Sequence, residues 1–286
     1  MRSRNSANVK GKTLRPQRSE TGCESILARY VLPFIVGLVP ACAQSPATPL
    51  NVYDGFESAK LSALWDSSRF ADGAVESESS IVRAGHSALR ITLRANDVYE
   101  RGRNGNRESE RDEVLESRAL YSHQDTLYKF SWSMYLPPDF PIVPVRLVIA
   151  QWKQDCVGGE SAPCSDDSPV LAVRYVGGFL RITQDIDRKR IVLYEEKRAL
   201  RGSWLDLRFR VRFTPRNAGH VQAWLNGKQV VDHRGVTANS ESASTGYPRP
   251  GDFYFKMGLY RDVMSRPMSI YIDEYHKREI EQRQSF

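Results

Sequence analysis

The chain has 286 residues, of which 41% are hydrophobic and 26% charged, a composition that excludes a disordered protein and allows one large all-β domain or two small ones. Seven of its 41 Lys and Arg and two of its 34 Asp and Glu lie in residues 1–43, which therefore hold most of the net charge of +7. The remainder carries a net charge of +2, so composition gives no argument for nucleic acid as a partner.

Residues 1–43 have the pattern of a signal peptide. Basic residues precede the apolar run from Tyr30 to Ala41, which ends in the small-x-small sequence Ala41-Cys42-Ala43. The run is about half the ~20 residues that a spanning helix needs, so we expect no stable membrane span. We expect a secreted or periplasmic protein, cleaved after Ala43 in preference to a lipid anchor at Cys42.

The mature chain is predicted to be a single all-β domain. Residues 44–51 form a linker, residues 52–276 the domain, and residues 277–286 a charged tail. Helical periodicity is suggested only at 59–65 and after His276, whereas short alternating segments separated by turns are typical of a two-sheet sandwich, a β-jelly roll of the concanavalin-like kind. The clearest predicted strands are 88–94, 128–136, 146–152, 170–176, 179–184, 190–195, 204–213, 220–225, 229–232, 253–260 and 268–275.

Two cysteines remain once the leader is removed. Cys156 and Cys164 flank a loop-like stretch, and in an oxidising compartment they are predicted to form a disulfide. The alternative is two free thiols. A metal site is disfavoured, because no further Cys and no close His completes a ligand set.

The segment 204–213 predicts a strand with a basic outer face. Its apolar residues alternate with Asp206, Arg208, Arg210 and Arg212. One interpretation is a solvated face with cross-strand ion pairs. The other is a basic lining for an acidic chain.

Three predicted strands place chemically active side chains on one sheet face. In 253–260 the apolar residues occupy one face, and a lysine, two tyrosines and a glycine occupy the other. In 146–152 the expected apolar face holds Val148, Ala150 and Trp152, and the other face becomes polar at its end. If these strands are neighbours, they form a groove for a carboxylated ligand. The candidates are Arg111 and Glu113, Gln151 and Lys153, and Tyr254, Lys256 and Tyr260.

These segments resemble the three motifs of jelly-roll polysaccharide lyases. They read Arg-Asp-Glu-Val-Leu, Ile-Ala-Gln-Trp-Lys and Tyr-Phe-Lys-Met-Gly-Leu-Tyr, in that order. The chain is similar to the heparin lyase I-like and glucuronan lyase group, with its Asp-Gly-Phe-Glu opening, and more distantly to alginate lyases of this fold. The resemblance runs from residue 52 to 276. Two positions differ: Lys153 stands where these families place histidine, and Leu115 where the alginate enzymes place an arginine.

The resemblance implies β-elimination on a uronic-acid polysaccharide. Arg111 and Gln151, with help from Lys153, would bind and neutralise the sugar carboxylate. Tyr260 would give a proton to the leaving oxygen and is a candidate for the base. Lys153 is left open as a base, a fixed cation or a sign of lost activity. Three further residues would contact the substrate or orient its ligands: Glu113, beside Arg111, and Lys256 and Tyr254.

Two other functions remain as alternatives. A carbohydrate-binding, lectin-like protein would use the same sandwich without catalysis. A glycosidase is disfavoured because hydrolysis needs two carboxylates and the motifs supply only Glu113. No cofactor is required, although Asp54, Glu57 and Asp273 could hold a structural Ca²⁺. We expect a monomer whose partner is the anionic polysaccharide.

Overall fold

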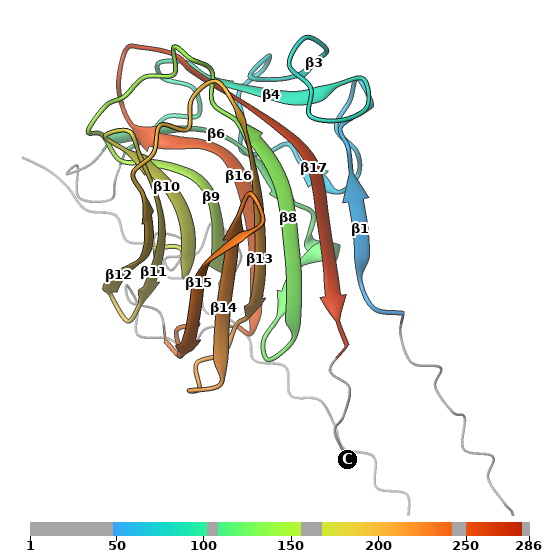
Figure 1. The fold of residues 1–286 in the computed structure, drawn as a ribbon, viewed down its shortest axis with the longest axis vertical. Helices are drawn as coiled ribbons and strands as arrows, with labels where there is room; N and C mark the ends of the chain where they lie inside the picture. The colour runs from blue at the N-terminus through green and yellow to red at the C-terminus, as the bar shows by residue number, and fades with distance from the viewer. Residues whose placement is uncertain (1–47, 102–107, 156–167, 242–249, 282–286) are drawn as a thin grey trace, which may run out of the picture. The chain divides into compact units, whose positions relative to one another are not determined.

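The computed structural model describes residues 48–101, 108–155, 168–241 and 250–281, all within the compact unit Ala47–Phe286. Two antiparallel sheets face each other in these residues (Figure 1), which confirms the all-β two-sheet prediction. The predicted cysteine pair, Cys156 and Cys164, the signal peptide and part of the linker lie outside the described residues.

The first sheet has eight strands. Their order is β15 (Lys228–Gly235), β14 (Gly219–Leu225), β13 (Trp204–Arg212), β8 (Leu127–Tyr135), β17 (Met268–Ile280), β4 (Ala88–Leu93) and β3 (Val75–Glu78), and β1 (Asn51–Asp54) also pairs with β17.

The second sheet has nine strands. Their order is β12 (Lys189–Glu196), β11 (Phe179–Ile186), β10 (Leu171–Val176), β9 (Leu147–Gln154), β16 (Asp252–Asp262), β6 (Glu108–Glu116) and β2 (Trp65–Asp66). Two short strands extend it, β5 (Glu100–Arg101) beside β6 and β7 (Ser122–His123) beside β16. A 3-10 turn, Arg118–Leu120, lies between β6 and β7.

The strands predicted above are all present, with shifted ends, and the suggested helices are wrong. Residues 59–64 form bends, turns and irregular backbone. β17 continues through His276 to Ile280, so the first four residues of the predicted tail are strand and Lys277 is fully buried. The tail was misjudged because its charges suggest solvent exposure, whereas Lys277 has a carboxylate partner inside the sandwich.

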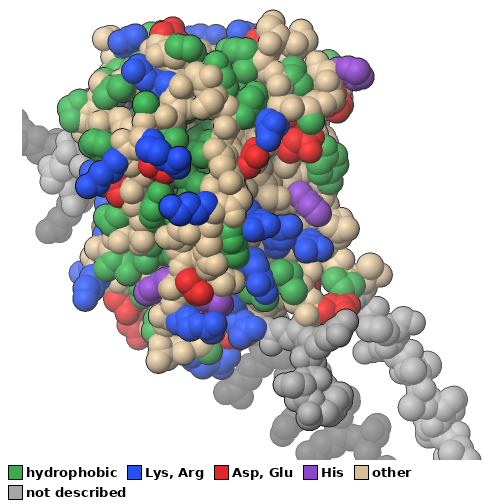
Figure 2. Space-filling view, viewed as in Figure 1, with side chains coloured by type: hydrophobic (Ala, Val, Ile, Leu, Met, Phe, Trp, Pro, Cys, Tyr) green, Lys and Arg blue, Asp and Glu red, His purple; other side chains and the backbone are tan. Residues whose placement is uncertain are grey.

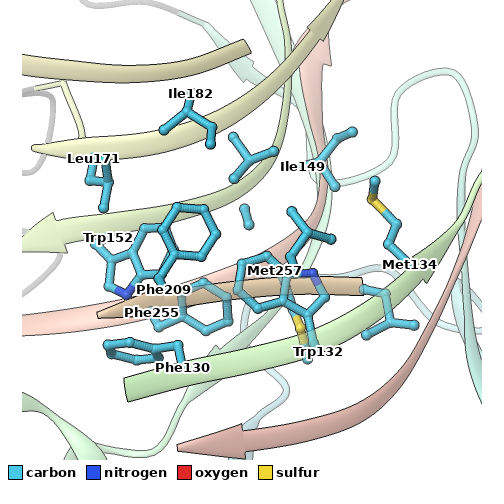
Figure 3. Packing of buried hydrophobic residues seen from close by; sticks show 14 of the residues in the cluster. Phe130, Trp132, Met134, Ile149, Trp152, Leu171, Ile182, Phe209, Phe255 and Met257 are labelled. Atoms are coloured by element: carbon cyan, nitrogen blue, oxygen red, sulfur yellow. The ribbon is translucent and has the colours of Figure 1, made fainter. Parts of the chain in front are cut away.

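An aromatic cluster fills the space between the sheets (Figure 3). Trp152 and Phe255 come from the nine-stranded sheet, and Trp132 and Phe209 come from the eight-stranded sheet. The Trp152 ring lies 4.8 Å from the rings of both Phe209 and Phe255, and Trp132 stacks on Phe209 at 5.5 Å. Each of these side chains is at most 2% exposed. Large aromatic areas buried at alternate strand positions hold the two sheets together.

A buried polar contact also joins the sheets. Lys277 on β17 donates to the Glu116 carboxylate on β6 at 2.9 Å, and the Tyr275 hydroxyl donates to the same carboxylate. Burial raises the pKa of Glu116 and lowers the pKa of Lys277, while each partner opposes that shift. Removing one partner would leave a buried charge without compensation, so the contact fixes which strands meet.

A register shift in the centre of the nine-stranded sheet changes one predicted face. Against β10, the strand β9 contains an extra residue near Ile149, so Arg174 pairs with Val148 while Val173 pairs with Ala150. Leu147 and Ile149 therefore pack in the core cluster, and Val148 does not. The prediction that Val148 shares the core face with Ala150 is wrong, because a bulge reverses the alternation.

Gly258 on β16 allows the close approach of β6 at this place. Its φ is +144°, and an added Cβ would lie 2.3 Å from the Asp112 carbonyl oxygen and 2.7 Å from the Glu113 Cα. Backbone atoms cannot move aside as a flexible side chain can. The glycine is therefore required both by conformation and by space.

We expect Gly258→Ala to destabilise the fold by about 3 kcal/mol or more, because backbone strain and overlap add. Gly227→Ala is the matched control: Gly227 also has a positive φ, +79°, but has nothing within 4 Å of an added Cβ. The control should lose only about 1 kcal/mol. Urea unfolding of both variants measures the difference, and equal losses would contradict the steric account.

Candidate active site

Strands β6, β16 and β9 lie side by side and bring the predicted residues together. Tyr260 pairs with Arg111 on one neighbour, and Lys256 pairs with Gln151 on the other. Gly258, between them on β16, pairs with Glu113. These residues alternate with the core residues of their strands, so they occupy the face turned away from the sandwich core. We refer to the face with Arg111, Glu113, Gln151, Lys256 and Tyr260 as the active face.

Glu113 is the central acceptor of the active face. Its carboxylate accepts a hydrogen bond from the Gln151 amide at 2.5 Å and one from the Arg111 guanidinium at 3.4 Å. Glu113 is fully buried, and Gln151 is 2% exposed. The carboxylate therefore fixes the orientation of a carboxamide and a guanidinium that belong to different strands.

Arg111 is held from both sides. Its guanidinium also donates to Glu100, on β5, and lies 4.2 Å from the centre of the Tyr260 ring. Burial by itself lowers the pKa of Arg111, but the carboxylates of Glu113 and Glu100 outweigh burial, and the net effect is a raised pKa. Arg111 is therefore a permanent, oriented cation beside the Tyr260 phenol.

Arg146 also contacts Tyr260 and was not among the predicted site residues. Its guanidinium lies 4.3 Å from the ring centre and donates to Asp262 at 2.8 Å. Because Arg111 is on β6 and Arg146 precedes β9, a guanidinium approaches Tyr260 from each neighbouring strand. Tyr260 is only partly buried, and its hydroxyl accepts a hydrogen bond from Ser109 at 3.4 Å.

Arg174 is a second cation that the sequence did not reveal. It is 6% exposed and pairs in register with Val148, the β9 partner of Tyr260. Burial lowers the pKa of Arg174 to about 10, with smaller contributions from Arg190 and Arg146. Alternation in β10, with Leu171, Val173 and Tyr175 in the core, turns Arg174 outward, and the bulge in β9 sets its pairing with Val148.

Lys256 is a buried amine in a cationic environment. It is 1% exposed, and its ammonium group lies 5.2 Å from the centre of the Tyr254 ring. Burial lowers the pKa of Lys256 to about 7; Glu113 opposes this shift and Arg111 adds to it. Near neutral pH the amine is therefore divided between charged and neutral forms, and an anionic ligand would favour the charged form.

This pKa predicts a pH-dependent stability. Between pH 7 and the ordinary value of 10.5, the unfolded chain binds a proton at Lys256 that the folded chain has released. Stability should therefore rise with pH through this window. We expect the melting temperature of the wild type to rise relative to that of Lys256→Met as pH increases from about 7 to 10. Lys228 is exposed, so the melting temperature of the control Lys228→Met should change with pH as that of the wild type does. If the melting temperature of Lys256→Met also follows the wild type, the lowered pKa of Lys256 is contradicted.

Lys153 and Tyr254 lie at the other end of the active strands. They pair with each other across β9 and β16. Since Tyr254 and Tyr260 are six residues apart, Lys153 lies roughly 20 Å along the strand from Tyr260. Lys153 is partly exposed. Tyr254 is 3% exposed, with its ring 5.4 Å from that of Tyr121, so sugar stacking on Tyr254 has no support from the geometry.

The three predicted calcium ligands all accept hydrogen bonds from the protein. Asp54 accepts from the Trp65 indole at 2.9 Å, and Glu57 and Asp273 each accept from backbone amides. Within the described ranges, no group of three or more His, Cys, Asp or Glu is arranged to hold a metal ion. The geometry therefore gives the calcium prediction no support.

The comparisons with known proteins identify the family. A family model for polysaccharide lyases matches residues 52–276. The chain belongs to the polysaccharide lyase family. This result confirms the prediction of a polysaccharide lyase, an enzyme that acts on a polysaccharide substrate. A search of the curated proteins finds no match.

Solved structures show that this polysaccharide lyase has the jelly-roll fold. An endo-β-1,4-glucuronan lyase from the fungus Trichoderma reesei is 17% identical, with a TM-score of 0.55; the match covers 76% of this chain and 90% of that one. The family 7 alginate lyase A1-II′ is 12% identical, with a TM-score of 0.51 and coverages of 73% and 85%. A GH131 β-glucanase catalytic domain from Podospora anserina is 12% identical, with a TM-score of 0.51 and coverages of 76% and 86%. At these identities the similarity establishes the fold alone. In the described ranges of the lyase, no helix has the length and apolarity needed to cross a membrane.

Proposed function

We propose that this polysaccharide lyase cleaves a uronic-acid-containing polysaccharide by β-elimination at the active face, after export from the cytoplasm. The supporting observation is the contact between Arg111, Glu113 and Gln151, placed directly beside Tyr260 in the register of β6, β16 and β9. A guanidinium and a carboxamide oriented by one carboxylate suit the planar carboxylate of a uronic acid. The basic leader and its small-x-small site support export.

The chemistry requires neutralisation of the sugar carboxylate. Loss of the C5 proton places a second negative charge on that group, and Arg111 and Gln151 would stabilise it as it develops. Because both donors are already fixed by Glu113, little reorganisation accompanies the reaction. The active face is therefore suited to removal of the C5 proton.

Tyr260 is proposed to move the proton. Its phenolate takes the C5 proton, the C4–oxygen bond breaks with its electron pair going to the leaving oxygen, and the phenol returns the proton to that oxygen. No proton is gained or lost overall, and the product has a double bond between C4 and C5. Arg111 and Arg146, each within 4.3 Å of the ring centre, would hold the ring in position during the step.

The test is incubation of the purified protein with alginate, polyglucuronate and heparin while the ultraviolet absorbance of the unsaturated product is recorded. An absorbance increase with any polyuronate is expected. New reducing ends without absorbance would indicate hydrolysis, and binding without either signal would indicate a lectin. N-terminal sequencing of exported protein should give a chain that starts after Ala43.

Lys153 is proposed to contribute charge at one end of the active face rather than proton transfer, because it lies far along the strand from Tyr260. Lys153→Gln should raise KM by about three- to tenfold, the loss of one ion pair, with kcat nearly unchanged. Lys189→Gln, an exposed lysine in the β11–β12 hairpin, is the control. A large fall in kcat for Lys153→Gln would instead identify it as the base.

A further inference from the structure

The outer face of the eight-stranded sheet contains a row of three directly opposed cations. Arg278 on β17 pairs in register with Lys129 on β8, and Lys129 pairs with Arg210 on β13. Among the residues that the structure describes, none of the three forms an ion pair with a carboxylate. For β13 the interpretation of cross-strand ion pairs is therefore not supported: among the described residues, Asp206 is the one outward residue of that strand with an ion-pair partner, Arg83 at 2.8 Å. Cross-strand contacts of this kind do occur elsewhere on the face, between Arg90 and Glu76 and between His220 and Asp232.

The row is electrostatically unfavourable by itself. Like charges directly opposite each other on neighbouring strands destabilise a sheet. Burial lowers the pKa of Lys129, and the nearby Arg278, Arg208 and Arg210 add to this shift. Lys and Arg side chains are also grouped on the side of the molecule seen in Figure 2. A bound anion would offset the repulsion that the protein alone leaves uncompensated.

A second row lies beside the cations and carries aromatic side chains at its ends. Its members pair in register from strand to strand, in the order Tyr53 on β1, His276 on β17, Ser131 on β8, Arg208 on β13 and Trp224 on β14. The row crosses five adjacent strands, a distance of roughly 19 Å. Tyr53 is 58% exposed, and the Arg208 guanidinium lies 4.5 Å from the centre of the Trp224 ring. Aromatic rings beside polar groups are typical of surfaces that bind sugars.

A cavity of about 430 Å³ opens along this second row, lined among others by Tyr53, Ser131, Arg208, Trp224 and His276. Its two carboxylates already have partners. Asp206 pairs with Arg83, and Glu274 accepts from the Tyr53 hydroxyl at 2.5 Å. Because these carboxylates are occupied, they do not neutralise Arg278, Lys129 and Arg210 in the neighbouring row. These three cations are therefore available to a ligand that enters from solvent.

We propose that this outer face is a second polysaccharide-binding site, which takes a carboxylated chain across β1, β17, β8, β13 and β14. The sandwich core separates it from the active face, so both sites can be occupied at once. Carboxylates spaced along the polymer meet the row of Arg278, Lys129 and Arg210, while sugar rings contact Tyr53 and Trp224 at the ends of the second row. The choice of a uronate polymer rests on the proposed function. Binding at a second site would hold the enzyme on a long substrate between cleavage events.

The test compares the double variant Lys129→Gln/Arg210→Gln with the control Arg188→Gln/Lys189→Gln, whose residues lie in an exposed hairpin of the other sheet. Binding is measured by affinity electrophoresis in gels that contain polyglucuronate, alginate, a neutral β-glucan, dextran sulfate or DNA. We expect polyuronate to retard the wild type and the control, and the dissociation constant of the double variant to be about three- to tenfold higher. Cleavage of short oligouronates should be unchanged, which also verifies that the variant is folded, while KM for the polymer should rise.

Equal retardation of the double variant and the wild type would overturn the second site even if lyase activity is present. If dextran sulfate or DNA retards the wild type as strongly as polyuronate does, the second site is overturned in favour of a general polyanion-binding surface. If no polymer yields an unsaturated product, the lyase proposal fails. The second site would still stand if polyuronate retards the double variant less than the wild type.

Discussion

Tyr260→Phe is expected to lower kcat by about 10²–10⁴-fold, the usual contribution of a positioned proton-transfer group. The substitution removes only the hydroxyl, so the ring still contacts Arg111 and Arg146, and binding of the polymer should persist. Release of the unsaturated product measures turnover, and titration with the polymer measures binding.

Tyr254→Phe is the matched control, because Tyr254 lies on the same strand and the same face. It should retain turnover within a few-fold. If Tyr260→Phe also retains turnover, or if both variants lose it equally, the proton-transfer role of Tyr260 is wrong.

Arg111→Gln should lower kcat/KM by about 10²–10³-fold, the cost of removing one donor from a stabilised oxyanion. The loss should fall mainly on kcat, because the second negative charge develops only during the reaction. Arg111→Lys keeps a charge but loses the two-sided contact with Glu113 and Glu100, so it should recover only part of the activity.

The control for Arg111 is Arg234→Gln on the exposed edge strand β15, which removes the same charge without touching the active face. Full rescue by Arg111→Lys would indicate that charge alone matters. A loss confined to KM would indicate that Arg111 binds the ground state without stabilising the reaction.

The sequence predicted the fold and the shared sheet face of five candidate residues, Arg111, Glu113, Gln151, Lys256 and Tyr260. Strict alternation in 253–260 assigned Lys256 and Tyr260 to one face, and the same rule placed Arg111 with Glu113. These predictions depend only on the two-residue period of a strand and on three strands being neighbours. The family resemblance indicated that the three strands are neighbours, which alternation alone does not predict.

The remaining site residues depend on register, which one sequence does not encode locally. Val148 reaches the active face, opposite Arg174, because β9 bulges near Ile149. Alternation in the predicted strand 146–152 placed Arg146 on the expected core face with Val148, and the same bulge reverses that assignment. Their positions follow from the paired strands as a whole, so they became visible only in the folded chain.

Charge misled the prediction at the end of β17. Lys277 lies in a charged segment that resembles a solvated tail, yet it pairs with Glu116 inside the sandwich. Glu116 sits at a core-facing position of β6, where alternation expects an apolar side chain. The buried carboxylate of one strand is compensated only by the buried ammonium group of a strand distant in sequence. Inspection of either segment alone does not reveal this pairing.

The position of β17 also constrains when this protein can fold. Although β17 ends the described chain, it is an inner strand of the eight-stranded sheet, between β8 and β4, and it supplies Lys277 to Glu116. A growing chain on the ribosome lacks that strand and leaves both neighbours with open edges. Completion of the sandwich must therefore wait until residue 280 has emerged from the ribosome.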